Sequence, residues 1–562
     1  MIRLFFIHLS LIVFFLSTAL LCLFYSELAM RAVPIAVETP HPVGAITLMP
    51  LDSRPPCTDY VKELGQMAGY KVLLPPVELL DDYKTPGHTA ELQKWLLREV
   101  SQTESAIISV DMLVHGGLWA SRQGHNSAAK ADEVINLLTS IHRFYPEIRL
   151  FAFNIIPRLF IAEKNLTAQY RNSMAEWSIL QDTFLIFENP RDLHRLQQLE
   201  HSLPPDLTGQ YRNLYTANRA LNLKLVKLVR DGVLSGLVIG QDDSAPFGLG
   251  NLERRHLEWV VQLQPELQGK VFITRGTDEV ALTMLRQATR SPQEPRTKVF
   301  VHYTEPHTAD SILPYMPGPL SRTVAEKLDI LGAFPVDAAA DANYILVIHA
   351  GNSFSQPKTL ANAADRIKNW LVTGKNIALV DLAADWSSDQ TLLPHLQANG
   401  SPLYKLIAYA GWNTASNSVG TAVTQAEMVL AGRSSSDLAT LLARDLDRIG
   451  FLAERFLDDW YYQKMYRTAL NDMLLQQKIN PYALGADRKK VSQRIRREMT
   501  DSFPRLVGRH WRDAQIILTA NSAAVFTIAD WKIEFGLPWD RTFEIRLDLK
   551  PTPALIERSE RH

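Results

Sequence analysis

The sequence predicts an α/β protein in which parallel strands alternate with helices. Ten short apolar runs recur between Ala45 and Tyr409, each followed by a polar loop and most by an amphipathic stretch such as Lys130–Phe144 or Leu214–Leu234. Continuous apolar runs of this length suit strands that are buried on both faces of a parallel sheet. The runs span residues 45–51, 71–74, 106–110, 150–155, 237–239, 271–274, 299–303, 344–348, 377–380 and 406–409.

Ten runs exceed the eight strands of one TIM barrel. Two arrangements fit: a TIM-barrel-like parallel β/α region with an additional α/β segment, or two separate α/β domains. A chain of 562 residues is also long enough for about two to four domains. We predict a barrel-like β/α catalytic region over residues 44–298, with residues 299–424 as its second part or as a separate α/β domain.

The C-terminal part of the chain changes character. Residues 425–514 are rich in Leu, Ala, Arg, Asp and Gln and predict a helical region, whereas residues 515–550 alternate apolar and polar side chains. Strict alternation predicts a small antiparallel β-element with one buried face. Residues 551–562 read as a frayed tail, and the proline-containing residues 30–43 read as a linker.

The N-terminus carries a targeting signal. Arg3 precedes an apolar run over residues 4–25, which at about 1.5 Å per residue reaches the roughly 30 Å of a hydrocarbon core. Residues 1–29 are therefore predicted to be a membrane anchor or a cleaved signal peptide. Either reading predicts an extracytoplasmic protein, in the periplasm or at the cell surface, that contacts the membrane through this segment.

Composition excludes several classes of protein. Lys plus Arg is 59 and Asp plus Glu is 60, so the charge balance does not favour a nucleic-acid partner. The two cysteines, Cys22 and Cys57, are too few for a cysteine-based zinc site. No glycine-rich dinucleotide loop, Walker A loop, HExxH or GxSxG motif is present, so we predict neither a bound nucleotide nor another cofactor.

Polar residues gather where the apolar runs end. Asp52 and Arg54 follow the first run, and Asp111 and His115 follow the run at 106–110. The carboxyl ends of parallel strands meet at one edge, where α/β proteins bind ligands. An Asp–Arg pair can grip a polar ligand or form a structural ion pair. Asp with His suits a metal site, an acid/base pair or an ordinary hydrogen-bonded loop.

Asp242 and Asp243 form the most informative of these clusters. Two adjacent carboxylates repel each other, which raises one pKa and prepares a general acid beside an ionised partner. Gly240 and Pro246 make a turn plausible, and a turn is needed for both side chains to face one site. The alternatives are a helix-capping Asp and a divalent-metal site shared with His115.

Other strand ends supply candidate substrate-binding residues with guanidinium, carboxylate, amide and indole groups. Trp412 beside Asn413 suits a sugar, whose CH face stacks on the indole while its hydroxyls meet amides; a core tryptophan is the alternative. Beyond the residues already named, the candidates are Arg158, Arg275, Asp278, Asn352, Trp412, Asn413 and Asn417.

Several phrases of the sequence resemble one family. These phrases are MPLDSRPPC, VDMLVHGGL, GQDDSAPFG, RGTDEVA, HAGNS, AGWNTASNSVG and GLPWDRTFEI. Together they resemble an uncharacterised bacterial family, domain of unknown function 4127, over roughly residues 45–550. The resemblance implies a domain extent and no particular activity.

A second resemblance concerns mechanism. When only the runs at 45, 106, 150 and 237 are counted, Asp242 and Asp243 follow the fourth strand. This is similar to barrel-type N-acetylhexosaminidases, in which an acidic pair at that position serves a substrate-assisted reaction. The resemblance implies that one carboxyl orients the acetamido group and that the other protonates the leaving oxygen.

These features lead to an exported glycoside hydrolase as the predicted function, acting on an envelope or extracellular glycan, with N-acetylated sugars as candidate substrates. Asp243 is the expected general acid and Asp242 the orienting carboxylate. One alternative is a metal-dependent envelope hydrolase with Asp111, His115 and Asp242 as ligands. The other alternative is a non-catalytic glycan-binding protein of the envelope.

Overall fold

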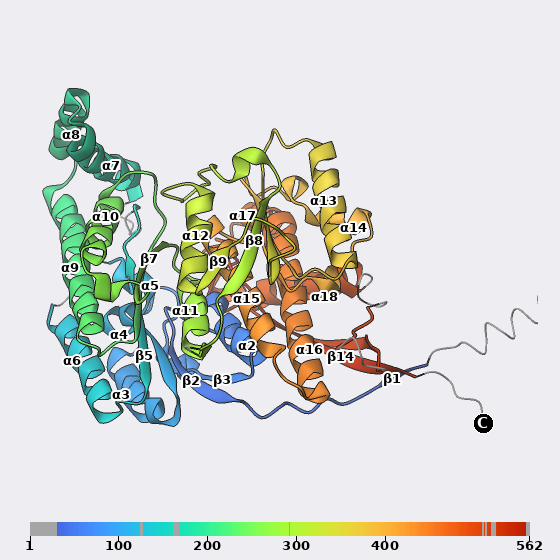
Figure 1. Ribbon diagram of the computed structural model, residues 1–562. Helices are drawn as coiled ribbons and strands as arrows, with labels where there is room; N and C mark the ends of the chain where they lie inside the picture. Colours follow the sequence, from blue (N-terminus) through green and yellow to red (C-terminus); the bar gives the residue numbers. More distant parts are fainter. Residues whose placement is uncertain are drawn as a thin grey trace, which may run out of the picture.

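The computed structural model shows two parallel sheets and one small antiparallel sheet, with helices packed around them (Figure 1). It describes residues 31–557, apart from 124–127, 161–167, 292, 509–510, 512–513 and 519–523. All ten apolar runs predicted to be strands form strands, so the α/β class is confirmed. The short strand β9 (Ala333–Pro335) was not predicted.

The first sheet has six parallel strands in the order β3-β2-β4-β5-β6-β7. Alternate residues of each strand enter two different cores, as the period of two requires. Ile107 of β4 faces the core that contains helices α2, α11 and α15, whereas Ile108 faces the core that contains α3, α6, α9 and α10. The strands are β2 (Gly44–Met49), β3 (Tyr70–Leu73), β4 (Ser105–Ser109), β5 (Arg149–Ile156), β6 (Gly236–Gln241) and β7 (Val271–Arg275).

The helices of this part connect successive strands. They are α2 (Asp59–Met67), α3 (Thr89–Glu99), α4 (Val110–His115), α5 (Leu118–Ser121), α6 (Ala128–Phe144), α7 (Arg171–Phe187), α8 (Pro190–Ser202), α9 (Pro205–Arg230), α10 (Leu249–Gln262) and α11 (Val280–Thr289). Helices α7 and α8 project from the body of the molecule, at the upper left of Figure 1.

The second sheet has five parallel strands in the order β12-β11-β10-β8-β9. Leu346 of β10 packs into the same core as Ile107, while Val347 faces the C-terminal helices. The two sheets therefore share one helical layer. The elements are β8 (Thr297–Tyr303), α12 (Leu320–Ile330), β9, β10 (Tyr344–Gly351), α13 (Pro357–Val372), β11 (Ile377–Ala383), α14 (Leu393–Ala398), β12 (Ala408–Ala410) and α15 (Ala415–Gly432).

The strand order decides between the two predicted arrangements in favour of two separate sheets. A barrel needs its last strand to pair with its first. Here β3 pairs with β2 and β7 pairs with β6, and no pairing joins β3 to β7 among the described strands. The chain places its second strand outside the first in both sheets, which leaves the edges open. The barrel-like closure is therefore corrected to two doubly wound sheets.

The C-terminal part contains helices followed by a small antiparallel sheet, as predicted. The helices are α16 (Leu438–Arg455), a π-helix over Phe456–Tyr466, α17 (Arg467–Gln476) and α18 (Arg488–Phe503). Strands β13 (Phe526–Gly536) and β14 (Arg546–Glu557) pair antiparallel, and β1 (Arg31–Pro34) adds to the other edge of β14.

Two boundary predictions at the ends of the chain need correction. Residues 551–557, predicted to be a tail, are the second half of β14, and residues 31–34, predicted to be linker, are β1. The prolines at 551 and 553 suggested a frayed end. Pro553 instead pairs with Ile528 beside a register shift in β13, and bulges of this kind tolerate proline within a sheet.

The predicted anchor or signal peptide over residues 1–29 lies outside the described residues. Within residues 31–557, leaving out the gaps named above, none of the helices is both long and apolar enough to cross a bilayer.

Candidate active site at the junction of the two sheets

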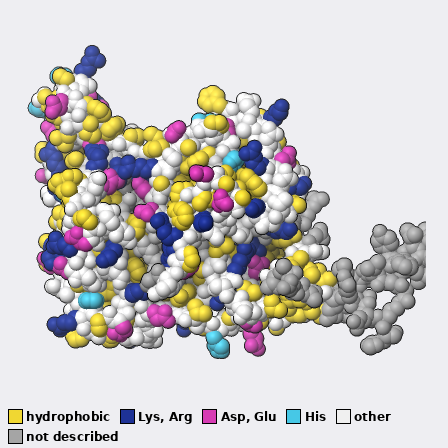
Figure 2. Space-filling model, viewed as in Figure 1, with side chains coloured by type: hydrophobic (Ala, Val, Ile, Leu, Met, Phe, Trp, Pro, Cys, Tyr) yellow, Lys and Arg dark blue, Asp and Glu magenta, His cyan; other side chains and the backbone are white. Residues whose placement is uncertain are grey.

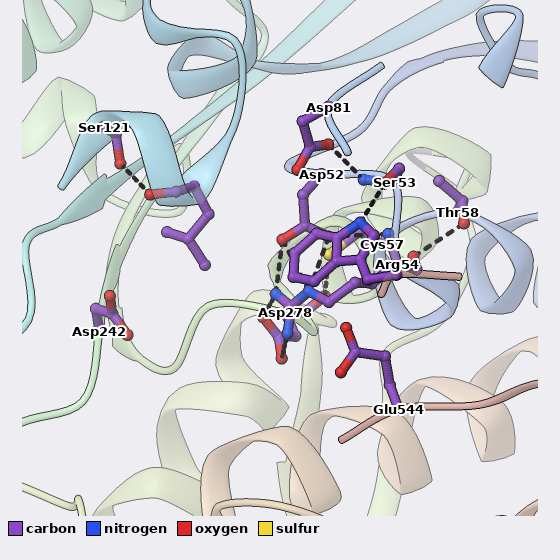
Figure 3. Close-up of polar contacts among 12 residues, drawn as sticks. Asp52, Ser53, Arg54, Cys57, Thr58, Asp81, Ser121, Asp242, Asp278 and Glu544 are labelled. Atoms are coloured by element: carbon purple, nitrogen blue, oxygen red, sulfur yellow. Dashed lines mark hydrogen bonds and ion pairs between the residues drawn. The ribbon is translucent and has the colours of Figure 1, made fainter. Parts of the chain in front are cut away.

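Loops that follow strands of both sheets meet at one buried polar junction, and Figure 3 shows its members Asp52, Arg54 and Asp278 from the first sheet. The loop after β2 supplies Asp52 and Arg54, and the loop after β7 supplies Asp278. The loop after β12, from the second sheet, supplies Asn413, and Asn417 follows in the first turn of α15. Five residues predicted from strand ends are thus brought together.

Arg54 joins the two acidic loops of the first sheet. Its guanidinium donates to Asp52 Oδ2 from Nη2 at 2.6 Å and from Nε at 3.0 Å, and to Asp278 Oδ1 from Nη2 at 2.7 Å. All three side chains are almost fully buried. Burial alone would lower the pKa of Arg54, but the charges of Asp278 and Asp52 outweigh it and raise that pKa. The guanidinium is therefore a permanent cation of the site.

The turn that presents Arg54 is set by local sequence. Pro55 begins a short helical turn over Pro55–Cys57, and the fixed φ of proline suits the first position of a helix. The carboxylate of Asp81 accepts the backbone N–H of Ser53 at 2.8 Å and holds the turn from the outside. Trp539 packs under the guanidinium, 5.2 Å from Arg54 Cζ to the ring centroid.

The side chain of Asp278 contacts loops of both parallel sheets. Besides Arg54, its Oδ2 accepts the amide N–H groups of Asn413 at 3.4 Å and Asn417 at 3.3 Å. Burial raises the pKa of Asp278, while the neighbouring Arg54 opposes that rise. Asn413 has φ 62°, a left-handed conformation that asparagine tolerates better than most residues.

Aromatic rings form a wall beside this junction. Tyr83 stacks on Trp539 with ring centroids 5.2 Å apart and tilts against Trp119 at 5.4 Å. The guanidinium of Arg541 lies over Tyr83 and Trp539, at 4.3 and 4.6 Å from their centroids. The predicted sugar-stacking residue Trp412 extends the wall through Phe543, 5.8 Å away. Such a wall can cover the apolar face of a ring-shaped ligand.

Asp242 and Asp243 lie on the loop after β6, separate from the Arg54 group but electrostatically linked to it. Arg122 donates to Asp242 Oδ2 from Nη2 at 2.5 Å and from Nε at 2.7 Å, and the N–H of Asp243 donates to Asp242 Oδ1 at 2.8 Å. Burial and the charge of Asp242 raise the pKa of Asp243 to about 6, with a smaller contribution from Asp278. The two adjacent carboxyls therefore occupy unequal environments.

Asp111 and His115 do not form the predicted ligand set with Asp242. Asp111 is buried, and its Oδ2 accepts the backbone N–H of Ile155 at 2.8 Å, which ties α4 to β5. Burial raises its pKa to about 7. Burial together with Lys130 lowers the pKa of His115 to about 4, so this imidazole is neutral over the physiological range. Asp111 serves as a structural tie, and the Asp111–His115–Asp242 metal site is corrected accordingly.

One cluster in the described part of the chain has metal-ligand atoms close together: Asp52, Cys57 and Asp278, whose donor atoms lie within 4.8 Å of one another. The guanidinium of Arg54 already bridges both carboxylates. Burial, with Asp52 and Asp278, also raises the pKa of the Cys57 thiol and disfavours the thiolate that a metal requires. The two carboxylates are therefore better suited to the guanidinium of Arg54, which already lies between them, than to a metal ion.

Three predicted substrate-binding residues have other surroundings. Arg158 lies beside Asp242 and Asp243, where burial and Arg122 lower its pKa to about 10. Arg275 is corrected: it is buried and ion-paired with Glu326 of α12, which fastens β7 to that helix. Asn352 lies at the carboxyl end of the second sheet, where its amide contacts His307 at 3.2 Å, and it stays a predicted substrate-binding residue.

A second buried polar group behind Asp278 was not predicted. Arg455, at the end of α16, donates to Asp459 at 2.7 Å and stacks over Tyr60 at 3.9 Å from the ring centroid. Asp459 belongs to the π-helix, a conformation found often at functional sites. A small cavity with room for about one water molecule separates this group from Asp278 and Trp412.

None of the unpredicted residues follows a parallel strand, and only positions after strands were searched for site residues. Trp539, Arg541 and Phe543 lie within the phrase GLPWDRTFEI, far from any parallel strand. Arg122 and Arg455 lie at the ends of helices. The density of aromatic and charged residues in the late phrase was the available signal for the first group.

Comparison with known protein families matches residues 46–548 to a family described as protein of unknown function (DUF4127). The chain belongs to this family. The match covers the residues described above, from Asp52 to Phe543, and agrees with the resemblance noted in the sequence phrases. No curated protein matches the chain.

Proposed function

We propose that the protein is an exported glycoside hydrolase, with Asp243 as general acid and Asp242 as its ionised neighbour. The observation that carries the proposal is the unequal environment of the two carboxyls. Arg122 donates two hydrogen bonds to Oδ2 of Asp242, whereas burial raises the pKa of Asp243 to about 6. A carboxyl with a raised pKa beside a carboxylate held by a guanidinium is how one site supplies both an acid and a charged partner.

The chemistry assigned to each residue follows from these contacts. Asp243 transfers its proton to the glycosidic oxygen as the bond from that oxygen to the anomeric carbon breaks, and water completes the hydrolysis. Asp242 has about four acceptor positions. Arg122 occupies two and the N–H of Asp243 one, which leaves a position for a substrate N–H such as that of an acetamido group.

The surroundings support a sugar as substrate. The partly exposed rings of Trp119, Tyr83 and Phe543 offer stacking surfaces, and the amides of Asn413 and Asn417 lie at Asp278. On the face visible in Figure 2, acidic and basic side chains are interspersed among the described residues. That mixture does not single out a highly charged polymer. Export rests on the apolar N-terminal run alone.

The test is hydrolysis by the full-length protein of a panel of chromogenic glycosides and purified peptidoglycan, wild type beside Asp243→Asn. The variant should lose about 10²- to 10⁴-fold in activity because the acid is gone. Its melting temperature should stay near that of the wild type. Asp132→Asn, which removes an exposed carboxylate paired with Lys224, is the matched control and should keep full activity.

The outcomes separate the competing functions. An Asp243→Asn variant that hydrolyses glycans as fast as the wild type would remove Asp243 from catalysis. Binding of glycans without hydrolysis, unchanged in the variant, would favour a non-catalytic glycan-binding protein. Hydrolysis abolished by a chelator and restored by a divalent metal would favour the metal-dependent alternative.

A further inference from the structure

The carboxyl end of the second sheet presents a pair of aromatic rings outside the junction. Tyr315, in the loop between β8 and α12, is 43% exposed, and Trp386, in the loop after β11, is 39% exposed. Their ring centroids lie 6.1 Å apart with 47° between the planes. Single exposed aromatics are common on protein surfaces, but here two loops far apart in the sequence bring two rings together.

The backbone of both residues is held in an uncommon conformation. Tyr315 has φ 64° and Trp386 has φ 62°, the left-handed region that bulky side chains rarely adopt. Such backbone strain persists only where the surrounding structure enforces it, and it concentrates at sites that bind ligands. Both partners of one exposed pair share this feature, which points to a shared role.

The pair is directly connected to the proposed catalytic loop. The backbone N–H of Ser244, the residue after Asp243, donates to the carbonyl of Tyr315 at 3.1 Å. One hydrogen bond therefore joins the loop of the general acid to the loop of the aromatic pair. Beside Trp386, Gln390 donates its amide to Asp385 at 2.8 Å, so carboxylate and amide groups border the indole.

We propose that Tyr315 and Trp386 form a distal subsite for one sugar ring of an oligosaccharide whose scissile bond lies at Asp243. The proposal rests on the proposed function and narrows its substrate to a glycan chain rather than a single glycoside. Aromatic rings cover the CH face of a sugar, and Asp385 and Gln390 can receive or supply hydrogen bonds to its hydroxyls.

The chain offers a matched control. Trp259, near the C-terminal end of α10, is 57% exposed and contacts His256 at 6.2 Å between ring centroids. Helix α10 runs from the loop of Asp243 back toward the amino ends of the strands, so Trp259 lies away from the proposed subsite. Removing this indole changes exposed aromatic surface without touching the Tyr315–Trp386 pair.

The test is calorimetric binding of a chitin-derived disaccharide and hexasaccharide to the full-length Asp243→Asn protein, which binds without turnover. Adding Trp386→Ala should weaken hexasaccharide binding about tenfold and leave disaccharide binding unchanged. Trp386→Gly should act alike, because glycine adopts φ 62° without strain and guards against a folding defect. Trp386→Tyr should restore part of the affinity, and Trp259→Ala should change neither ligand.

Unchanged hexasaccharide binding in both Trp386 variants would overturn the subsite. Equal weakening of both ligands would also overturn it, because the effect would then reach the catalytic position. If the Asp243→Asn protein binds neither sugar, the proposed subsite for N-acetylated chains is contradicted. Hydrolysis of other glycosides by the wild type would then show that the proposed function survives without it.

Discussion

The first five strands of each parallel sheet, counted along the chain, have the same order, but the two sheets contribute differently to the junction. In each, the first strand lies between the second and the third, so the chain reverses direction there, which is where open α/β sheets usually bind ligands. The first sheet uses this position: Asp52 and Arg54 follow its first strand. The second sheet instead contributes Asn413 from the far edge, after β12.

The difference lies in the side chains at each reversal point. After β8, Thr304 pairs with His349 at 2.8 Å and Glu305 with Ser355 at 2.7 Å. His349 and Glu305 are buried, and these groups pair with neighbours on loops of their own sheet. After β2, Asp52 and Arg54 are buried and reach across to Asp278. Topology thus offers equivalent positions, and the side chains determine which of them reaches the junction.

Removing Asp278 should produce the largest effect, because it joins the two sheets. Asp278→Ala would leave Arg54 buried with one carboxylate and both amides without their acceptor. Breaking one side of a buried ion pair costs about 3–5 kcal/mol. We expect a loss of that size in the free energy of unfolding, measured by urea denaturation.

The control for this variant is an ion pair at the surface. Glu176 pairs with Arg195 at 2.7 Å, and both side chains are more than two-fifths exposed. Glu176→Ala should therefore cost less than about 1 kcal/mol. Equal losses in the two variants would show that the junction does not hold the sheets together.

The next effect is specific to the first sheet and depends on pH. Burial raises the pKa of Asp111 from its ordinary value of 3.8 to about 7, so the folded state holds the proton more tightly than the unfolded state. The stability from this group is full below pH 3.8 and is lost as the pH rises through about 7.

Asp111→Asn removes this titration and keeps a carbonyl to accept the N–H of Ile155. Between about pH 5 and pH 8 the wild type should lose on the order of 2 kcal/mol more stability than the variant. Thermal unfolding across that range measures the difference, with the exposed Asp132→Asn as control. Parallel pH profiles for wild type and Asp111→Asn would contradict the assignment.

The smallest effect tests the contribution of the second sheet. Asn413→Gly removes one amide donor, whose bond to Asp278 is long at 3.4 Å, and should cost about 1 kcal/mol or less. Asn413→Ala should be more destabilising than Asn413→Gly, because φ 62° strains alanine. The order of the two melting temperatures gives the answer, and alanine above glycine would argue against the left-handed conformation.

Local sequence patterns were enough to predict the strands and the junction residues that directly follow those strands. Apolar runs such as Leu150–Ile155 must be buried on both faces, and the residues after them must lie at a common edge. The choice between a barrel and two sheets depends on which edges pair, and no run of residues encodes that locally. The structure shows two open sheets because β3 pairs only with β2 among the described strands and so forms an edge.

Residues that reach the junction by long-range packing could not be predicted in the same way. Trp539 donates its indole N–H to Ser53 at 2.7 Å across 486 positions of sequence. Arg275 failed for the opposite reason, since it ends a strand as predicted but turns to Glu326 on α12. Which side of a strand end faces the ligand depends on the helix packed there.

The pairing of β1 with β14 sets Arg31 opposite Glu557, so the first and last described residues lie side by side (Figure 1). Antiparallel strands that share an end separate like a zipper when pulled apart there, one rung of hydrogen bonds after another. A tether at the N-terminal side and a load at the C-terminal side would thus open this edge first. The same proximity makes the fold suited to circular permutation, with the old ends joined and new ones cut in an exposed loop.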